Sequence, residues 1–143
     1  MSEILVDNLT GKTSAGSIVV YGEGGTATTN LQQGLAKAWI SLDGATPAVR
    51  DSNNVASVTD NGTGDYTTNF SDSMNNTNYG VSGACCGNGS VNTASNGVQI
   101  NSSAYNTVSA PTTSAFRSVS IHDVNGVKQD VDYLTLTVNG DLA

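Results

Sequence analysis

The chain has 143 residues, a formal net charge of −7, and charged side chains at only 12% of its positions. Its length fits one ordinary domain. Its negative charge argues against a nucleic-acid partner, because the phosphate backbone needs a cationic surface. No apolar run approaches the roughly 20 residues that a membrane-spanning helix needs, so we expect no membrane insertion. A low charge density combined with β-branched residues indicates a folded, β-rich chain rather than a disordered one.

The first residues, Met1–Asp7, contain neither the basic segment nor the apolar segment of a secretory signal peptide. The rest of the chain nevertheless has the few lysines and the many short polar side chains of an extracellular surface protein. Both features fit a protein that is made in the cytoplasm and exposed later by another route, as a virion component is when the cell lyses. A leader that had already been removed is the alternative explanation.

Residues 1–30 are predicted to form an N-terminal arm. Two short β-prone runs, Ile4–Val6 and Ser17–Tyr21, are separated by the breaker-rich stretch Thr10–Gly16. The glycine-rich run Gly22–Thr26 follows them and predicts a flexible joint. These pieces are too thin to form a core alone, so we expect the arm to attach to a neighbouring subunit or to a larger particle.

The segment Asn30–Leu42 changes its pattern half-way. Its first half predicts a short helical turn. From Ala36 onward, apolar residues at alternate positions face one side while Lys37, Trp39 and Ser41 face the other, which predicts a strand. We expect the single tryptophan, Trp39, to anchor the core rather than to serve as a ligand platform.

The clearest local signal is a hairpin centred on Asp60–Asp65. Two β-prone arms flank this run, and an Asn-Gly pair is the strongest short hairpin signal. The run resembles a calcium loop only loosely, because the positions at which an EF-hand needs Gly and Glu hold Asp65 and Ser71. Further strands are predicted at Tyr79–Ala84, Val98–Asn101, Phe116–His122 and Val131–Val138, with a turn at Asn125-Gly126 before the last of them.

Short strands with a turn every 8 to 12 residues or so are typical of two-layer all-β folds. We therefore predict an all-β fold for residues 31–143, an antiparallel β-sandwich or jelly-roll-like domain, which carries residues 1–30 as its extended arm. A chain poor in large apolar residues buries little core alone. We expect an oligomer, in which neighbouring subunits add buried area and cover open sheet edges.

Catalytic and cofactor chemistry is not expected. The single histidine, His122, stands beside Asp123 without any activated-serine motif, so no Ser-His-Asp triad is predicted. The only cysteines, Cys85 and Cys86, are adjacent and cannot staple distant segments, and His122 alone cannot complete a metal site with them. We expect a buried or turn-lying thiol pair, no metal and no cofactor.

Two glycine-rich runs, Gly22–Gly25 and Gly87–Ser90, lack the Lys-Ser/Thr of a phosphate-binding loop and are predicted to be ordinary loops. Carbohydrate binding is chemically permitted, because sugar sites combine aromatic faces with Asn, Asp and Gln. The sequence does not identify which aromatic residues are exposed, so no contact residue is assigned. The candidates are Trp39, Tyr21, Tyr66, Tyr79, Tyr105 and Tyr133.

Three runs stand out: GLAKAW at residues 34–39, Ala48–Val55 and TDNGTGDYT at residues 59–67. In these runs the chain resembles a family of small structural proteins and fibre domains of marine tailed bacteriophages, including cyanophages. A homotrimer is a common arrangement for phage fibres and decoration proteins, so the resemblance implies a homotrimer. Phe70, Met74 and Asn78-Tyr79 match the family spacing, and the ends, Ile4–Ile18 and Asn139–Ala143, are similar as well. Gly83–Thr113 does not match, as expected of a variable loop region.

The resemblance implies a non-enzymatic virion structural protein, commonly tail-fibre-like, and it carries no catalytic or ligand residue. The expected partners are other virion proteins, reached through the arm, and a host surface glycan, reached through the loops between Gly83 and Thr113. A capsid decoration protein, whose arm clamps the phage head, is the alternative within the same class. A free carbohydrate-binding or adhesin module is the alternative from another class.

Overall fold

The computed structural model describes residues 4–11, 18–22, 25–87, 96–104, 107–122 and 126–143. The chain divides into two compact units, Met1–Leu35 and Ala36–Ala143, whereas the sequence places the boundary near residue 30. Each unit is described by itself below.

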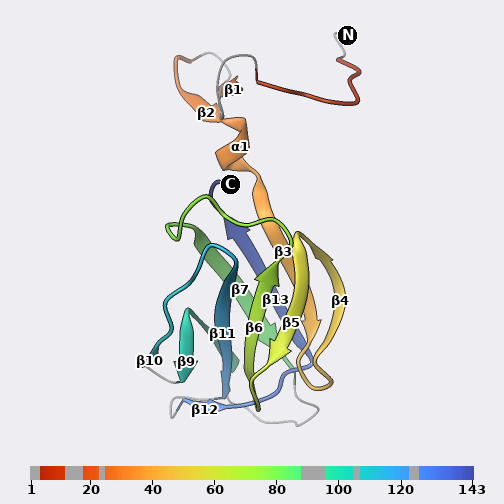
Figure 1. Ribbon diagram of the computed structural model, residues 1–143, viewed down its shortest axis with the longest axis vertical. Helices are drawn as coiled ribbons and strands as arrows, with labels where there is room; N and C mark the ends of the chain where they lie inside the picture. Colours follow the sequence, from red (N-terminus) through yellow and green to blue (C-terminus); the bar gives the residue numbers. More distant parts are fainter. Residues whose placement is uncertain (1–3, 12–17, 23–24, 88–95, 105–106, 123–125) are drawn as a thin grey trace. The chain divides into compact units, whose positions relative to one another are not determined.

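The described residues of the N-terminal unit form a small hairpin and a helical turn (Figure 1). Strand β1 (Val19–Tyr21) pairs antiparallel with β2 (Thr28–Asn30), and α1 (Leu31–Gly34) follows directly. The Asn30 side chain caps the helical turn by accepting a hydrogen bond of 3.1 Å from the Gln33 amide. The predicted helical turn is therefore confirmed.

Ile4–Val6, a β-prone run, pairs with no other described segment, and its residues are exposed. Gly22 and Gly25 lie between β1 and β2, where the Gly22 amide donates to the Ala27 carbonyl at 3.0 Å. Residues 23 and 24 of the glycine-rich run lie outside the described residues, so the flexible joint stays a prediction.

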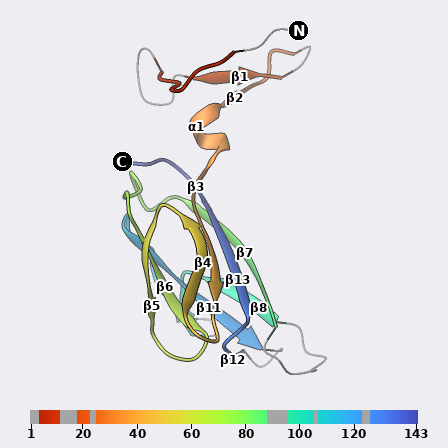
Figure 2. The same cartoon turned by 90° about the vertical axis from the view of Figure 1, so that its right-hand side faces the viewer.

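The larger unit is built from two antiparallel sheets, with a further short hairpin (Figures 1 and 2). The first, here called the β13 sheet, has the order β4-β3-β13-β7, with bounds Ala48–Asn53, Ala36–Asp43, Tyr133–Asn139 and Gly80–Cys86. The second, the β11 sheet, has the order β12-β11-β6-β5, with bounds Val127–Lys128, Ala115–His122, Asp65–Phe70 and Val55–Asp60; β8 (Asn96–Ile100) also pairs with β11. The short hairpin joins β9 (Ser102–Ala104) to β10 (Thr107–Val108).

Both sheets contribute side chains to one hydrophobic core, and the all-β prediction is thereby confirmed. The alternation predicted for the last strand places Leu134, Leu136 and Val138 inside, each with 2% or less of its surface exposed. The Phe70 ring packs against Phe116 at 5.7 Å between centroids. The core members from the β13 sheet are Ala38, Ile40, Leu42, Leu134, Leu136 and Val138, and those from the β11 sheet are Tyr66, Phe70 and Phe116.

Strand β3 shows how a bulge alters an alternating pattern. Val138 pairs with Ala38 but Asn139 pairs with Ala36, so Lys37 is an extra residue in the ladder. As a result Ala36 is exposed and Lys37 is buried, the reverse of the predicted faces. The prediction that Trp39 anchors the core is also wrong, because Trp39 lies on the outward face and is 37% exposed.

Strands β4 and β5 follow each other with a single residue between them, yet they belong to different sheets. That residue, Asn54, has a φ of 54°, a left-handed conformation that Asn tolerates better than most side chains. Its side chain holds the kink: Nδ2 donates to the Asp72 carbonyl at 3.1 Å, and Oδ1 accepts from the Asp72 amide at 2.6 Å. The chain thereby crosses from the β13 sheet to the β11 sheet.

The predicted hairpin at Asp60–Asp65 is confirmed. The Asn61 amide donates to the Asp65 carbonyl at 2.8 Å, and the Asp65 amide donates to the Gly62 carbonyl at 3.0 Å. Strands β5 and β6 pair antiparallel on either side of this turn. The backbone amides of Asn61 and Asp65 and the carbonyls of Gly62 and Asp65 therefore form hydrogen bonds within the hairpin itself.

Candidate functional site

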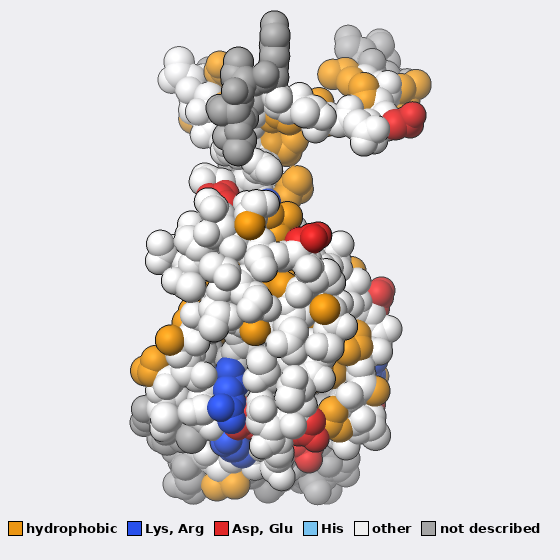
Figure 3. Space-filling model, viewed as in Figure 1, with side chains coloured by type: hydrophobic (Ala, Val, Ile, Leu, Met, Phe, Trp, Pro, Cys, Tyr) orange, Lys and Arg blue, Asp and Glu red, His pale blue; other side chains and the backbone are white. Residues whose placement is uncertain are grey.

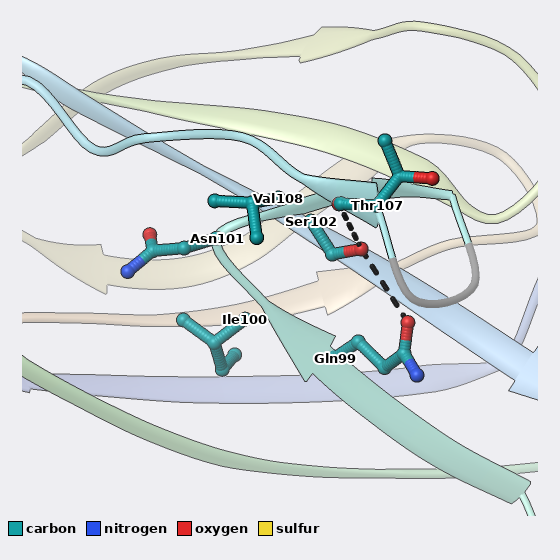
Figure 4. Close-up of a pocket in the computed structure, with 6 residues that line it drawn as sticks. All are labelled: Gln99, Ile100, Asn101, Ser102, Thr107 and Val108. Carbon is teal, nitrogen blue, oxygen red and sulfur yellow. Dashed lines mark hydrogen bonds between the residues drawn. The ribbon is translucent and has the colours of Figure 1, made fainter.

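The structure contains a pocket of about 500 Å³ where β8, β9 and β10 meet (Figure 4). Within the described chain it is lined by Gln99, Ile100, Asn101, Ser102, Thr107 and Val108. Its volume falls in the range of roughly 300 to 1,000 Å³ that small-molecule sites occupy. The pocket lies inside Gly83–Thr113, the segment from which the sequence predicts a host contact.

Hydrogen bonds between neighbouring strands hold one side of the pocket. The Ser102 hydroxyl donates to the Thr107 carbonyl at 2.8 Å and lies 3.4 Å from the Gln99 side-chain oxygen. Figure 4 shows this chain of contacts, with Ile100, Asn101 and Val108 lying to the other side of it. Ser102 is 6% exposed, so the two strands are fixed to each other by a buried hydroxyl.

Asn101 is the unusual residue of the pocket. Its φ is 54°, and its backbone is fixed at both ends, because its amide donates to the Arg117 carbonyl and its carbonyl accepts from the Ser109 amide, each at 2.7 Å. Its side-chain Oδ1 is buried and accepts no hydrogen bond from the described residues. A buried polar atom without a partner costs about 1–3 kcal/mol, so Oδ1 is a vacant acceptor at the pocket.

The chemistry of the lining permits binding and offers nothing for catalysis. The six residues supply amides, hydroxyls and aliphatic side chains, and none of them titrates near neutral pH. A ligand that fits is neutral and brings an N–H or O–H donor for Asn101 together with an apolar edge for Ile100 and Val108. The pocket wall has no aromatic ring among the described residues, so it lacks a stacking surface.

Asn54 and Asn101, which share a φ of 54°, allow a test of whether Asn101 Oδ1 lacks a hydrogen-bond partner. Asn54→Gly is expected to destabilise the protein by about 1–2 kcal/mol, because two hydrogen bonds to Asp72 are lost. Asn101→Gly is expected to change the free energy of unfolding by less than about 0.5 kcal/mol or to raise it, because the unpaired Oδ1 is removed. Urea denaturation measures both. An Asn101→Gly cost as large as that of Asn54→Gly would show that Oδ1 has a partner in solution.

A buried ionic cluster, which the sequence does not predict, lies on the β11 sheet. The Asp65 carboxylate is 1% exposed and accepts from Arg117 Nε at 2.6 Å, from Arg117 Nη2 at 2.8 Å and from Lys128 Nζ. Burial alone would raise the pKa of Asp65, but the hydrogen bonds and charges of Arg117 and Lys128 lower it below its usual value. Figure 3 shows Lys and Arg side chains gathered at one place on this face.

This cluster ties three strands together. Both cations are committed to the same carboxylate, and their side chains are 30% exposed. The Asp65 carboxylate joins β6 to β11 and β12, because Arg117 lies on β11 and Lys128 on β12. No local spacing in the sequence signals the cluster, since the partners lie 52 and 63 residues from Asp65.

The residues that the sequence marks for chemistry are not brought together. His122 ends β11, and Asp123 lies outside the described residues. Cys85 and Cys86 are free thiols on β7, one half-buried and one exposed, so the prediction of a buried or turn-lying pair is wrong. Because neighbours in a strand face opposite sides, the two thiols point away from each other. Burial raises the pKa of Cys85. Across the described ranges, no group of three His, Cys, Asp or Glu side chains could hold a metal ion.

The candidate aromatic residues divide into buried and exposed sets. Tyr66 and Tyr79 are core residues, and burial raises the pKa of Tyr79 to about 12. Tyr105, the one aromatic residue in the predicted contact loops, lies outside the described residues. The exposed set is Tyr21, Trp39 and Tyr133.

No protein-family model, curated protein or solved structure is similar enough to this chain to count as a match. Among the described residues there is also no helix with the length and apolar character to cross a membrane.

Proposed function

We propose that this chain is a virion structural protein of a tailed bacteriophage, a tail fibre or fibre-associated protein. In this proposal residues 36–143 form a β-sandwich displayed on the particle. The N-terminal unit, Met1–Leu35, attaches it to other virion proteins. A homotrimer is the expected assembly.

The supporting observation is the exposure of apolar side chains in the N-terminal unit. Among the described residues, eight of the fourteen exposed large hydrophobic side chains belong to this unit, which holds about a quarter of the chain. Figure 3 shows hydrophobic side chains at its surface. They are Ile4, Leu5, Val6, Leu9, Val19, Val20, Tyr21 and Leu35.

Such a unit gains stability by burying these side chains against another chain. A two-stranded sheet such as β1–β2 is marginally stable at best in water. Ile4 and Leu5 are 84% and 83% exposed, so nearly their whole surface is available. At about 25 cal/mol per Å², burying each of them contributes roughly 1.5–3 kcal/mol, and contiguous exposed apolar surface is typical of interaction sites.

A full-length variant tests the attachment. Ile4→Ser, Leu5→Ser and Val6→Ser together are expected to lower incorporation into particles by at least about tenfold, because the three most amino-terminal described apolar side chains lose their burial. The measurement is quantitative mass spectrometry of purified virions. The matched control replaces three exposed valines of the larger unit: Val49→Ser, Val108→Ser and Val127→Ser.

Incorporation that survives the first triple substitution at the level of the control would contradict the attachment role. Immunogold labelling of intact particles then separates the two virion positions. Gold at the tail supports the fibre, and gold spread over the head supports the capsid decoration protein. Light scattering of the purified chain tests the trimer, which a monodisperse monomer would contradict.

A further inference from the structure

The outward face of the β13 sheet carries two of the exposed aromatic residues. Trp39 on β3 pairs with Thr137 on β13, and Tyr133 lies four residues before Thr137 on the same strand. Residues two and four apart in a strand point to one face, so both rings belong to the outward side. Trp39 is 37% exposed and Tyr133 is 51% exposed.

The two rings are separated by a row of short side chains. At about 3.3 Å per residue, four residues along β13 put Tyr133 roughly 13 Å from the row of Trp39. The row between them contains Asp51, Ser41, Thr135 and Ala84, which are cross-strand partners from β4 to β7. None of these side chains is as large as an aromatic ring, so short side chains separate the two exposed rings. The outward face from Trp39 to Tyr133 is here called the aromatic face.

The Tyr133 ring is held in place by an arginine that a β-bulge directs towards it. Ser41 pairs with Asp51 and Leu42 with Val49, so Arg50 is the extra residue of β4. Its guanidinium lies 4.1 Å from the Tyr133 ring centroid and donates to Asp43 Oδ2 at 2.7 Å and to the Asp132 carbonyl at 2.9 Å. The guanidinium covers one face of the ring, so a ligand stacks on the other face. The ring is positioned before any ligand arrives, which lowers the entropy lost on binding.

We propose that this aromatic face binds a neutral, extended oligosaccharide, with Trp39 and Tyr133 as stacking platforms for two of its sugar rings. The apolar C–H faces of a pyranose pack on aromatic rings, and its hydroxyls donate to acceptors such as the exposed Asp51 carboxylate between the rings. The net charge of −7 and the carboxylates of this face disfavour acidic sugars. The inference rests on the proposed tail-fibre role, and it moves the glycan contact expected from the sequence from the Gly83–Thr113 loops to the sheet.

A second copy of the chain suits this face less well. An isologous contact brings the same patch of each subunit together, so the Asp51 carboxylates would approach one another. Stable interfaces also place an uncharged apolar centre between polar rims. Here the order is reversed, since the centre is polar and the rings lie towards the ends.

The sole tryptophan makes the test direct, because Trp39 is the chain's only source of indole emission. The full-length protein is titrated with cellohexaose, laminarihexaose and mannohexaose, and with a galacturonic acid hexamer as the acidic counterpart. A saturable change in Trp39 emission is expected with at least one neutral hexasaccharide and none with the acidic one. Absence of a saturable change with all three neutral sugars up to about 10 mM, a Kd worth less than about 3 kcal/mol by the standard relation, would overturn the proposal.

Variants assign the signal to the face. Tyr133→Ala is expected to weaken the Kd at least about tenfold, whereas Tyr133→Phe keeps the ring and stays close to the unsubstituted chain. Asn101→Gly alters the β8–β10 pocket and is expected to leave the Kd unchanged; a loss of binding in Asn101→Gly alone would place the sugar in the pocket and overturn the proposal. An emission shift that follows protein concentration without sugar would identify a self-interface and overturn it too.

Failure here is distinguishable from failure of the virion role. Tyr133→Ala is expected to enter particles as well as the unsubstituted chain, because the exposed side chains of Met1–Leu35 are unchanged. Normal incorporation without sugar binding would reject the platform alone. Sugar binding without particle incorporation would reject the virion role alone.

Discussion

Asp65→Asn is expected to lower the free energy of unfolding by about 3 kcal/mol. Removing one partner of a buried ion pair typically costs about 3–5 kcal/mol, because the other charge loses its compensation. Here the value falls at the low end, since the Arg117 and Lys128 side chains are each 30% exposed and water solvates part of the released charge. Urea denaturation followed by circular dichroism measures the change.

The control for this substitution is Asp51→Asn. Asp51 is also a strand carboxylate, but it is exposed, and it accepts a local hydrogen bond from the Ser52 amide at 2.8 Å. A surface change of this kind is expected to stay within about 0.5 kcal/mol. Equal effects of the two substitutions would show that the Asp65 cluster contributes nothing beyond an ordinary surface charge.

The pH dependence of the free energy of unfolding, compared between the unsubstituted chain and Asp65→Asn, gives a second test. The pKa of Asp65 is lower in the folded chain than its ordinary value of 3.8, because Arg117 and Lys128 stabilise the carboxylate. The stability it contributes is therefore complete above the unfolded pKa and is lost as the pH falls through the folded pKa. The difference between the unsubstituted chain and Asp65→Asn is therefore expected to shrink on acidification below about pH 4. A difference that stays constant between neutral pH and pH of about 2 would contradict the assignment.

Gly64→Ala is expected to destabilise the protein by about 3–4 kcal/mol. A Cβ at this position would lie 2.6 Å from both the amide nitrogen and the carbonyl oxygen of Gln129 and 2.7 Å from the Ser120 carbonyl oxygen. These atoms cannot retreat easily, because Ser120 donates to the Gly64 carbonyl at 2.8 Å and Gln129 donates to the Ser120 carbonyl at 3.1 Å. Overpacking of about 1–3 kcal/mol adds to the roughly 1–2 kcal/mol of a left-handed conformation.

The matched control for Gly64 is Gly62, two residues earlier in the same hairpin. Gly62 also has a positive φ, 113°, but an added Cβ would meet nothing within 4 Å. Gly62→Ala is therefore expected to cost only the backbone term, about 1–2 kcal/mol. If the two alanine variants unfold at the same urea concentration, the close packing around Gly64 has no energetic effect.

Much of the β-structure could be predicted because the responsible patterns are local. The alternation of Tyr133–Asn139 reports which side chains face the core, and Asn61-Gly62 reports a hairpin through its backbone preference. Strand β4 was missed because its residues are mostly exposed and show no apolar alternation. The two-residue strands β10 and β12 are too short to produce a period at all.

The sites were less predictable because they depend on register and on distant partners. Tyr133 alternates with the core residue Leu134 along the strand, and this alternation predicts that the Tyr133 side chain faces outward. The orientation of Arg50 towards its ring could not be predicted, because it depends on a bulge in the β3–β4 ladder. The general preference of tryptophan for burial predicts a core position for Trp39. The alternation of its own strand, however, places Trp39 on the face opposite to that of Ile40.

The kink at Asn54 limits how a strand of another chain can pair with the outer edges of the two sheets. Strands β4 and β5 are the outer strands of their sheets, and an outer strand that is long and straight invites a foreign strand to pair with it. The left-handed residue between them breaks this border into two segments of six residues that run in different sheets, and each segment carries its own register shift. A straight foreign strand cannot follow both segments. The border that β4 and β5 form therefore offers a foreign strand no long, straight partner.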